Sequence, residues 1–391
     1  MICGGEGSRG GSRSELSPAA QIRRSIYDLN AYDYDLPQSL IAQTPAVPRD
    51  AARLLVWRVS NGVEHQVFGD IVDYLRPGDL LVLNDTRVLP VRLRGVRADS
   101  KVGGKAEILL LSPVSNDFDK WRALVRPGRR LGIGSGVAVG GRVLTIVGEE
   151  DDGVRIVQAG TGRKDVLSFL DKYGSMPLPP YIKNIKNADP LSARLDYQTV
   201  FALNDGSAAA PTAGLHFTKE LIRRVEERGT EIARVTLHVG LGTFRPVKSL
   251  DIRKHRIHSE YCQVPKATET AVRACRARQG RVVAVGTTVV RTLESMADGD
   301  GTVPSATVKS GSMDTDLFIY PGYSYKVVDA LITNFHLPKS SLLMLVSAFV
   351  NHLEGGGREE AALDSLRKIY SLAVSERYRF FSFGDAMYIE K

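Results

Sequence analysis

The stretch between residues 87 and 160 constrains the fold more than any other part of this sequence. Short apolar runs recur there at a spacing of roughly ten residues, separated by Gly, Pro, Asp and Asn, and none has the length or period of a helix. The runs are Val91–Val96, Ala106–Leu111, Trp121–Val125, Val137–Val147 and Val154–Val157. This pattern predicts a small antiparallel β-barrel at residues 87–160, inserted in another domain.

On either side of that stretch, strand-like and helix-like patterns alternate. We expect buried strands at Leu54–Val59, Leu80–Leu83, Ile232–Val239, Val282–Val285 and Ala330–Thr333. We expect helices at Phe68–Leu75, Lys266–Gln279, Val289–Ala297, Ser341–Val350 and Glu359–Ala373. The polar residues 298–315 read as a loop. The fold class is therefore α/β: a layered α/β core domain of residues 30–86 and 161–391, with the inserted barrel domain.

Composition limits the class of protein. A chain of 391 residues with 43% hydrophobic and 25% charged residues is typical of a soluble protein of about two domains. No apolar run approaches the ~20 residues that cross a bilayer, so we expect no membrane association. Residues 1–29, rich in Gly, Ser and Arg near their start, read as a disordered extension.

Charge and cysteine content point to the partner and the compartment. The net charge of +8 favours a polyanionic partner, although many basic proteins bind no nucleic acid. The three cysteines, Cys3, Cys262 and Cys275, have no metal-ligand spacing, so we expect neither a disulfide framework nor a metal site. A reducing cytoplasm fits this pattern.

A run of very small side chains from Gly206 to Gly214 precedes His216 and Phe217. Such a run cannot anchor a core, but it lets the backbone approach a ligand closely beside one titratable ring. A helix follows, capped by Thr218 and ended by Gly229. The alternative is that the run is only a flexible connector.

Two further candidate ligand loops follow predicted strands. Gly286-Thr287-Thr288 leads from a strand into the first turn of a helix, where free N–H groups favour an anion. Either threonine could instead merely cap the helix. The second loop, Thr333–Ser341, contains Asn334 and His336 between a buried strand and a buried helix. Polar groups there must find partners, and His336 could equally be a satisfied core histidine.

Glycines and charges follow two other strands. His238–Phe244 contains Gly240, Gly242 and Thr243, but a lone Gly-x-Gly is weak evidence for a ligand site. The basic residues that follow could contact phosphates or form a solvated face; they are Arg245, Lys248, Arg253, Lys254, His255, Arg256 and His258. Asp85 and Arg87 could stabilise a turn, or Asp85 could be a base.

Two aromatic segments leave similar alternatives. Met176–Tyr181 is a stiff, proline-rich segment that could form a pocket wall or dock a linker. Arg377–Asp385 combines cations with phenylalanines, as RNA binding would use, yet those rings could be core.

Taken together, these motifs closely resemble the S-adenosylmethionine:tRNA ribosyltransferase-isomerase (QueA) family of queuosine biosynthesis. The resemblance runs in order through almost the whole chain. Its segments are Tyr34–Gln43, Pro48–Val56, Asn84–Arg92, Met176–Tyr181, Tyr197–Phe217, Val235–Phe244, His255–Glu260, Val285–Ser295, Asp316–Tyr323, Val327–Phe349 and Glu376–Met387. Departures from the family pattern are Leu241, Arg245, Asp205 and Tyr261.

The resemblance implies a two-domain protein and a reaction. The ribosyl part of S-adenosylmethionine is transferred to 7-aminomethyl-7-deazaguanine at the tRNA wobble position and isomerised, giving epoxyqueuosine with release of adenine and methionine. It implies S-adenosylmethionine as co-substrate, tRNA with a guanine-derived wobble base as partner, and neither a metal nor a tightly bound cofactor. We expect a cytoplasmic monomer.

The chemistry assigns roles as hypotheses. The sulfonium acidifies the adjacent ribose C–H, so a base is needed, and leaving and entering groups need proton transfer. The candidate catalytic residues are His216, His238, His336, Asp85 and Glu260. The candidate S-adenosylmethionine-binding residues are Thr212, Gly214, Gly240, Gly242, Thr243, Thr287, Thr288, Arg291 and Asn334. The candidate tRNA-binding residues are those of the basic run from Arg245 to His258.

Two rival functions remain. A Rossmann methyltransferase needs an early strand followed by a Gly-rich loop and an acid after the next strand, which this sequence lacks in that order. A non-catalytic RNA-binding protein would explain the charge but not polar loops at the ends of core strands. Adenine release that depends on tRNA separates the three.

Overall fold

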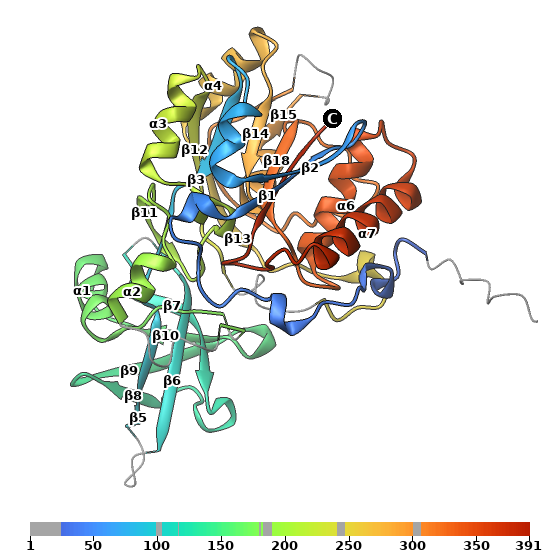
Figure 1. The fold of residues 1–391 in the computed structure, drawn as a ribbon. Coiled ribbons are helices and arrows are strands. Elements are labelled where there is room, and N and C mark those ends of the chain that lie inside the picture. Colours follow the sequence, from blue (N-terminus) through green and yellow to red (C-terminus); the bar gives the residue numbers. More distant parts are fainter. Residues whose placement is uncertain are drawn as a thin grey trace, which may run out of the picture.

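The structure is a computed structural model that describes residues 25–98, 104–115, 117–179, 181–182, 190–240, 247–299 and 306–391. A large mixed sheet flanked by helices forms one body, and a closed barrel forms a second, smaller body below it in Figure 1. The α/β fold class with an inserted barrel is thereby confirmed. No helix among the described residues is long and apolar enough to cross a membrane.

The large sheet has nine strands in the order β17-β13-β12-β3-β14-β18-β19-β1-β2. The four central strands pair in parallel; they are β12 (Glu231–Leu237), β3 (Leu80–Asn84), β14 (Val282–Val285) and β18 (Ala330–Asn334). The outer strands are β17 (Gly311–Thr315), β13 (Glu260–Val264), β19 (Ala386–Glu390), β1 (Arg53–Arg58) and β2 (Gly62–Val67). Parallel pairing brings the four central carboxyl ends to one edge of the sheet.

Every residue of β3, β14 and β18 is buried because helices cover both faces of the sheet. Leu80 and Val82 pack on one face, and Leu81 and Leu83 pack on the other, as the two-residue period of a strand requires. The first face is covered by α4 (Lys266–Ala277), α5 (Thr287–Ser295), α6 (Ser341–Leu353) and α7 (Glu359–Ser375). The second is covered by α3 (Lys219–Glu227) and the 3-10 helix η4 (Phe68–Asp73).

The barrel closes in the order β10-β7-β6-β5-β8-β9, with every pair antiparallel. Its strands are β5 (Arg92–Arg97), β6 (Lys105–Pro113), β7 (Lys120–Arg126), β8 (Gly136–Val139), β9 (Arg142–Glu149) and β10 (Arg155–Gln158). Trp121, Leu93 and Ile108 fill its interior. The predicted run Val137–Val147 is two strands, because Gly140 and Gly141 have positive φ and form a turn.

Helix α1 (Arg163–Tyr173) follows the barrel and packs against it. Its buried Val166, Phe169 and Leu170 belong to the same hydrophobic cluster as the barrel interior. The chain then passes through α2 (Pro190–Asp196) to β11 (Asn204–Ser207), which pairs in parallel with β4 (Thr86–Val88) between the two bodies. At this short sheet the chain passes from the core into the barrel through β4, and it returns to the core through β11.

Several local predictions are wrong. The predicted loop 298–315 contains β16 (Thr307–Val308), which pairs with β15 (Ala297–Asp298), and the edge strand β17. Most of β17 is exposed, so its sequence carries no apolar alternation. The predicted extension 1–29 lies outside the described residues as far as residue 24, but Leu29 is buried in the core.

One buried charge network links the strands at the edge of the sheet where the central parallel strands begin. Arg281, before β14, donates to the Asp79 carboxylate at 2.5 Å and also to Glu390 at the end of β19. Both acids are nearly buried, with side chains 3% and 4% exposed. Arg281 also donates to the carbonyl of Tyr74 at 2.9 Å. The guanidinium therefore joins strands that are distant in the sequence.

Replacing Arg281 tests this network. Arg281→Met leaves Asp79 and Glu390 without their shared cation, so we expect the free energy of unfolding to fall by about 3 kcal/mol or more. Chemical denaturation measures this change. Arg228→Met removes a pair with Asp73 in which both side chains are more than half exposed and should leave stability nearly unchanged. Equal effects of the two substitutions would contradict the account.

Candidate active site

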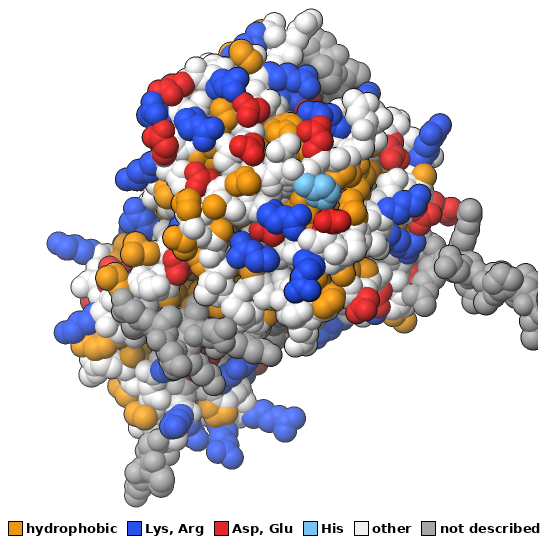
Figure 2. Space-filling view, in the orientation of Figure 1, with side chains coloured by type: hydrophobic (Ala, Val, Ile, Leu, Met, Phe, Trp, Pro, Cys, Tyr) orange, Lys and Arg blue, Asp and Glu red, His pale blue; other side chains and the backbone are white. Residues whose placement is uncertain are grey.

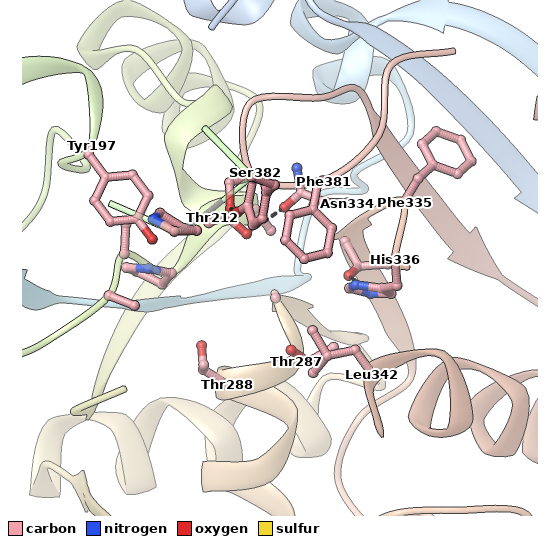
Figure 3. Close-up of a pocket in the computed structure, with 18 residues that line it drawn as sticks. Tyr197, Thr212, Thr287, Thr288, Asn334, Phe335, His336, Leu342, Phe381 and Ser382 are labelled. Atoms are coloured by element: carbon pink, nitrogen blue, oxygen red, sulfur yellow. Dashed lines mark hydrogen bonds between the residues drawn. The ribbon is translucent and has the colours of Figure 1, made fainter. Parts of the chain in front are cut away.

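A cavity lies at the edge where the central parallel strands end. The cavity is partly open to solvent, and the space between its walls, solvent included, is about 680 Å³. Its lining comes from segments far apart in the sequence (Figure 3). The lining residues are Pro179, Tyr181, Tyr197, Ala209, Ala210, Pro211, Thr212, Ala213, Gly286, Thr287, Thr288, Thr333, Asn334, Phe335, His336, Leu342, Phe381 and Ser382.

The turn from β14 into α5 forms one wall. Gly286 is the N-cap residue, its φ is +89°, and no side chain caps the helix. Thr287 and Thr288 therefore do not serve as the cap, which was the alternative left open by the sequence. Both line the cavity, and the Thr288 hydroxyl accepts a hydrogen bond from Asn84 Nδ2 at 3.2 Å. The uncapped N–H groups and hydroxyls make this wall suited to an anion.

The small-residue loop forms the facing wall through the 3-10 helix η8 (Thr212–His216). Thr212 donates to Asn334 Oδ1 at 2.9 Å, and Asn334 Nδ2 contacts His216 Nε2 at 3.1 Å. The flexible-connector alternative is therefore wrong, because this loop is buried and joined to β18. A Cβ on Gly214 would lie 2.8 Å from the Phe201 ring, so the close packing needs glycine there.

His216 lies behind the wall rather than in it. Its ring stacks on Phe68 with centroids 4.8 Å apart. Burial lowers the pKa of His216 to about 3, with Arg379 and Arg49 acting in the same direction and a hydrogen bond to the Arg49 backbone opposing it. Because Asn334 donates to Nε2, the proton resides on Nδ1 and the basic lone pair is occupied. This neutral ring orients Asn334.

His336 lines the cavity directly. Its Nε2 contacts the Thr333 hydroxyl at 2.9 Å, and its backbone N–H donates to the Tyr370 hydroxyl at 3.1 Å. The Tyr34 hydroxyl donates to the His336 carbonyl. Burial lowers the pKa of His336 to about 3. Of the described residues, none forms a hydrogen bond with Nδ1, which leaves that nitrogen for a ligand.

Asp85 and His238 lie outside the cavity lining. Asp85 Oδ1 accepts from the Thr236 hydroxyl at 2.7 Å and from Asn204 Nδ2 at 3.0 Å, joining β3 and β12 to β11. His238 Nδ1 contacts the Thr86 hydroxyl at 2.8 Å, and burial lowers the pKa of His238 to about 4. Gly206 is required beside it, because a Cβ there would lie 2.6 Å from Nε2.

Glu260 and Arg291 form a buried ion pair beneath the same edge of the sheet. Glu260 Oε1 also accepts from the Gly240 N–H at 2.8 Å, and Arg291 Nε donates to the Leu317 carbonyl at 3.0 Å. Neither side chain is part of the cavity lining. Because the two charges are paired with each other, these side chains hold the edge of the sheet together from outside the cavity lining.

The basic run is only partly described. Gly242, Thr243 and Arg245 lie outside the described residues, as does the departure Leu241. Lys248, Arg253, Lys254 and Arg256 are exposed, and Arg253 pairs with Asp251 at 2.9 Å. His255 packs edge-on against Phe318, while His258 Nε2 lies 3.8 Å from Asp152 of the barrel. The run therefore reaches from the core to the barrel.

Sequence reasoning missed the aromatic part of the lining. Tyr181 and Phe381 pack edge-to-face with centroids 4.0 Å apart, and the Tyr181 hydroxyl contacts Ser382. Tyr197 also lines the cavity, and in Figure 3 it lies on the side of Thr212 away from His336. The proline-rich segment and the phenylalanine-rich segment indicated these residues only in general terms, whereas Phe380 and Phe383 are core residues.

Known proteins are similar to this chain over most of its length. Residues 29–389 match the family described as Queuosine biosynthesis protein. An S-adenosylmethionine:tRNA ribosyltransferase-isomerase from Symbiobacterium thermophilum is 51% identical over 365 residues, 92% of this chain and 99% of that protein. A protein of the same name from Moorella thermoacetica is 51% identical over 364 residues, 92% of this chain and 99% of its own length.

One solved structure is also similar. It is the crystal structure of an S-adenosylmethionine tRNA ribosyltransferase from Thermotoga maritima, with 36% identity and a TM-score of 0.49. The similarity covers 93% of this chain and 100% of that one.

The buried neutral histidines predict a pH dependence of stability. An unfolded histidine titrates near pH 6.5, whereas burial holds the pKa of His216 at about 3. Between these values the unfolded chain binds more protons, so stability is full above about pH 6.5 and falls as the pH drops towards 3. His216→Gln should reduce the slope by up to about 1.4 kcal/mol per pH unit.

Denaturation midpoints at a series of pH values from 7 to 4 measure this slope. If the stabilities of the wild type and the variant fell equally across that pH range, the result would contradict the buried, neutral state of His216.

Proposed function

Because the chain belongs to the Queuosine biosynthesis protein family, we propose that it is an S-adenosylmethionine:tRNA ribosyltransferase-isomerase. It transfers the ribosyl moiety of S-adenosylmethionine to 7-aminomethyl-7-deazaguanine at the wobble position of tRNA and isomerises it. Epoxyqueuosine forms, and adenine and methionine leave. The observation that best supports a catalytic site is the single cavity that collects hydroxyls, an amide and an imidazole at the ends of parallel strands.

The α5 N-terminus suits the methionine part of the donor. A carboxylate beside the uncapped turn at Gly286 would accept backbone N–H bonds and meet the positive end of the helix dipole. Thr287 and Thr288 add hydroxyl donors, and Asn84 orients Thr288. Arg291 is occupied by Glu260, so we propose that it supports this wall from behind rather than binding the carboxylate itself.

The aromatic side of the cavity suits the planar groups. A flipped nucleobase and the adenine both present flat faces, which stack on aromatic rings. Tyr181, Tyr197 and Phe381 supply such rings around the cavity. We therefore propose that the nucleobases enter between these rings, opposite Thr287.

His336 is the proposed base. It lines the cavity, it is neutral because burial lowers its pKa to about 3, and Nδ1 is available to a ligand. A pKa of about 3 describes a weak base, but a methionine carboxylate bound near the ring would raise it. His336 would then accept the proton from the ribose carbon next to the sulfonium. His216 holds Asn334 and Thr212 in place, as a positioning residue.

Other parts of the proposal rest on the sequence and on the family. We propose that Asp85, His238 and Glu260 act by supporting the strand ends, and that the basic run contacts tRNA. A cytoplasmic location, a monomeric state and the lack of a tightly bound cofactor or metal also belong to the proposal.

Removing the His336 imidazole tests the proposed base. His336→Gln should lower kcat for tRNA-dependent adenine release about 10²- to 10⁴-fold, because a positioned base contributes about that much. Affinity for S-adenosylmethionine, measured by calorimetry, should change little. His65→Gln is the matched control, since His65 contacts Tyr378 and is not part of the cavity lining.

Two results would contradict this assignment. Full activity of His336→Gln would exclude His336 as the base, and full activity of the corresponding His216 and His238 variants as well would exclude a histidine base. If the wild type released no adenine with modified tRNA, the proposed function itself would be wrong.

The carboxylate-binding wall makes a separate prediction. Thr287→Val removes one hydroxyl donor, so KM for S-adenosylmethionine should rise about tenfold, the effect of losing one hydrogen bond to a charged group. Affinity for tRNA should not change. Thr270→Val on the exposed face of α4 serves as the control. An unchanged KM would place the carboxylate elsewhere.

A further inference from the structure

The outer face of the barrel carries arginines whose charges the structure leaves largely unbalanced. On β5, Arg94 is exposed and Arg92 is half-buried, and both lie on the side opposite Leu93, which is buried in the barrel interior. On β7, Arg126 is exposed, and Arg129 and Arg130 follow it in the next turn. We call Arg92, Arg94, Arg126, Arg129 and Arg130 the barrel arginine patch.

The strand register places two of these arginines on either side of one acid. Glu107 of β6 lies directly opposite both Arg94 and Arg126, so the three side chains form one row across the outer face. Glu107 contacts Arg94 at 3.4 Å, with the side chains 70% and 26% exposed for Arg94 and Glu107. Among the described residues, no acid forms an ion pair with Arg126, Arg129 or Arg130. Within this row, one carboxylate thus lies between two guanidinium groups.

Three other arginines of the barrel have acid partners. Arg122 of β7 contacts Glu150 at 3.0 Å, and Arg155 of β10 contacts Glu149 at 2.6 Å. Arg142 of β9 contacts Asp165 at 2.6 Å. Each of these three arginines has its own acid, whereas among the described residues Glu107 is the one acid that pairs with an arginine of the patch. In Figure 2, Lys and Arg side chains project from the lower end of the molecule, where Figure 1 places the barrel.

Arg92 connects the patch to the cavity. Its backbone pairs with Ser175 through hydrogen bonds of 3.1 and 2.9 Å, and its Nη2 donates to the Leu178 carbonyl at 3.2 Å. The next residue, Pro179, lines the cavity, as does Tyr181. Arg92 Nε is buried without a partner. The patch thus begins at the segment that forms the cavity wall and runs outward along the barrel.

We propose that the barrel arginine patch binds the phosphate backbone of the tRNA anticodon arm while the wobble base occupies the cavity. This inference rests on the proposed function and names the surface that holds its RNA substrate. Guanidinium groups suit phosphate because their planar donors form paired hydrogen bonds with its oxygens. Alternate residues of a strand are about 7 Å apart, so Arg92 and Arg94 can reach successive phosphates.

An RNA backbone fits the patch better than an acidic protein surface does. The charge lies on an open, outward strand face with one acid in it, which suits a continuous polyanion. The patch also leads to the cavity that must receive a base from the same polyanion. The exposed basic run from Lys248 to His258 reaches the barrel through His258 and Asp152, so a second basic segment lies close to the barrel.

The double variant Arg94→Gln and Arg126→Gln tests the proposal in the full-length chain. The RNA is an anticodon stem-loop carrying 7-aminomethyl-7-deazaguanine, and its Kd is measured by fluorescence anisotropy across a salt series. Two lost phosphate contacts should weaken binding at least about fivefold and lower the salt slope by about 1.5. The Kd for S-adenosylmethionine and kcat at saturating RNA should stay unchanged.

Two further variants make the result unambiguous. Arg223→Gln with Arg228→Gln removes two comparably exposed arginines of the α3 segment, and it should not change RNA affinity. Glu107→Gln removes the only acid in the row and should tighten RNA binding about twofold to threefold.

If the Arg94/Arg126 variant binds RNA with the same affinity and the same salt slope as the wild type, the patch does not bind RNA. This result would count against the patch whether or not the proposed function is correct. If the wild type itself neither bound this RNA nor released adenine with it, the proposed function would fail and the patch assignment with it.

Discussion

Parallel pairing of β12, β3, β14 and β18 obliges their carboxyl ends to meet at one edge of the sheet, and the candidate site depends on this constraint. All of β3, β14 and β18 is buried, and the turns that follow β14 and β18 line the cavity. Polar groups at those turns must then pair with one another or with a ligand. The Thr212–Asn334–His216 contacts show the first outcome, and the uncapped turn at Gly286 is suited to the second.

Much of the fold could be predicted because its signals are local. Thr218 and Gly229 bound α3 as their capping chemistry requires, and the recurring short runs marked the barrel strands. Several strands were missed, including β13, which alternates buried and exposed residues, and β19, which is buried throughout. Two others have weak patterns. β17 is a mostly exposed edge strand, and β2 is exposed or half-buried throughout, so neither shows the alternation that identifies a strand.

Some members of the site could be predicted, but not their roles. Thr287, Thr288, Asn334 and His336 follow predicted strands, and all four line the cavity. The position of His216 depends on Asn334, 118 residues away, and Arg291 pairs with Glu260 of a strand that the sequence did not indicate. Such pairings depend on strand order, which no local pattern contains. The unbalanced arginines of the barrel also become visible only when the register places Glu107 between Arg94 and Arg126.

The central claim is that one cavity at these strand ends holds the sulfonium donor together with the extruded wobble base. A structure of the protein with S-adenosylmethionine and a modified anticodon stem-loop tests it most directly. The account predicts the methionine carboxylate at the first turn of α5 and the deazaguanine beside Phe381 and Tyr181. Density for the donor on any surface away from Thr287 and His336 would contradict it.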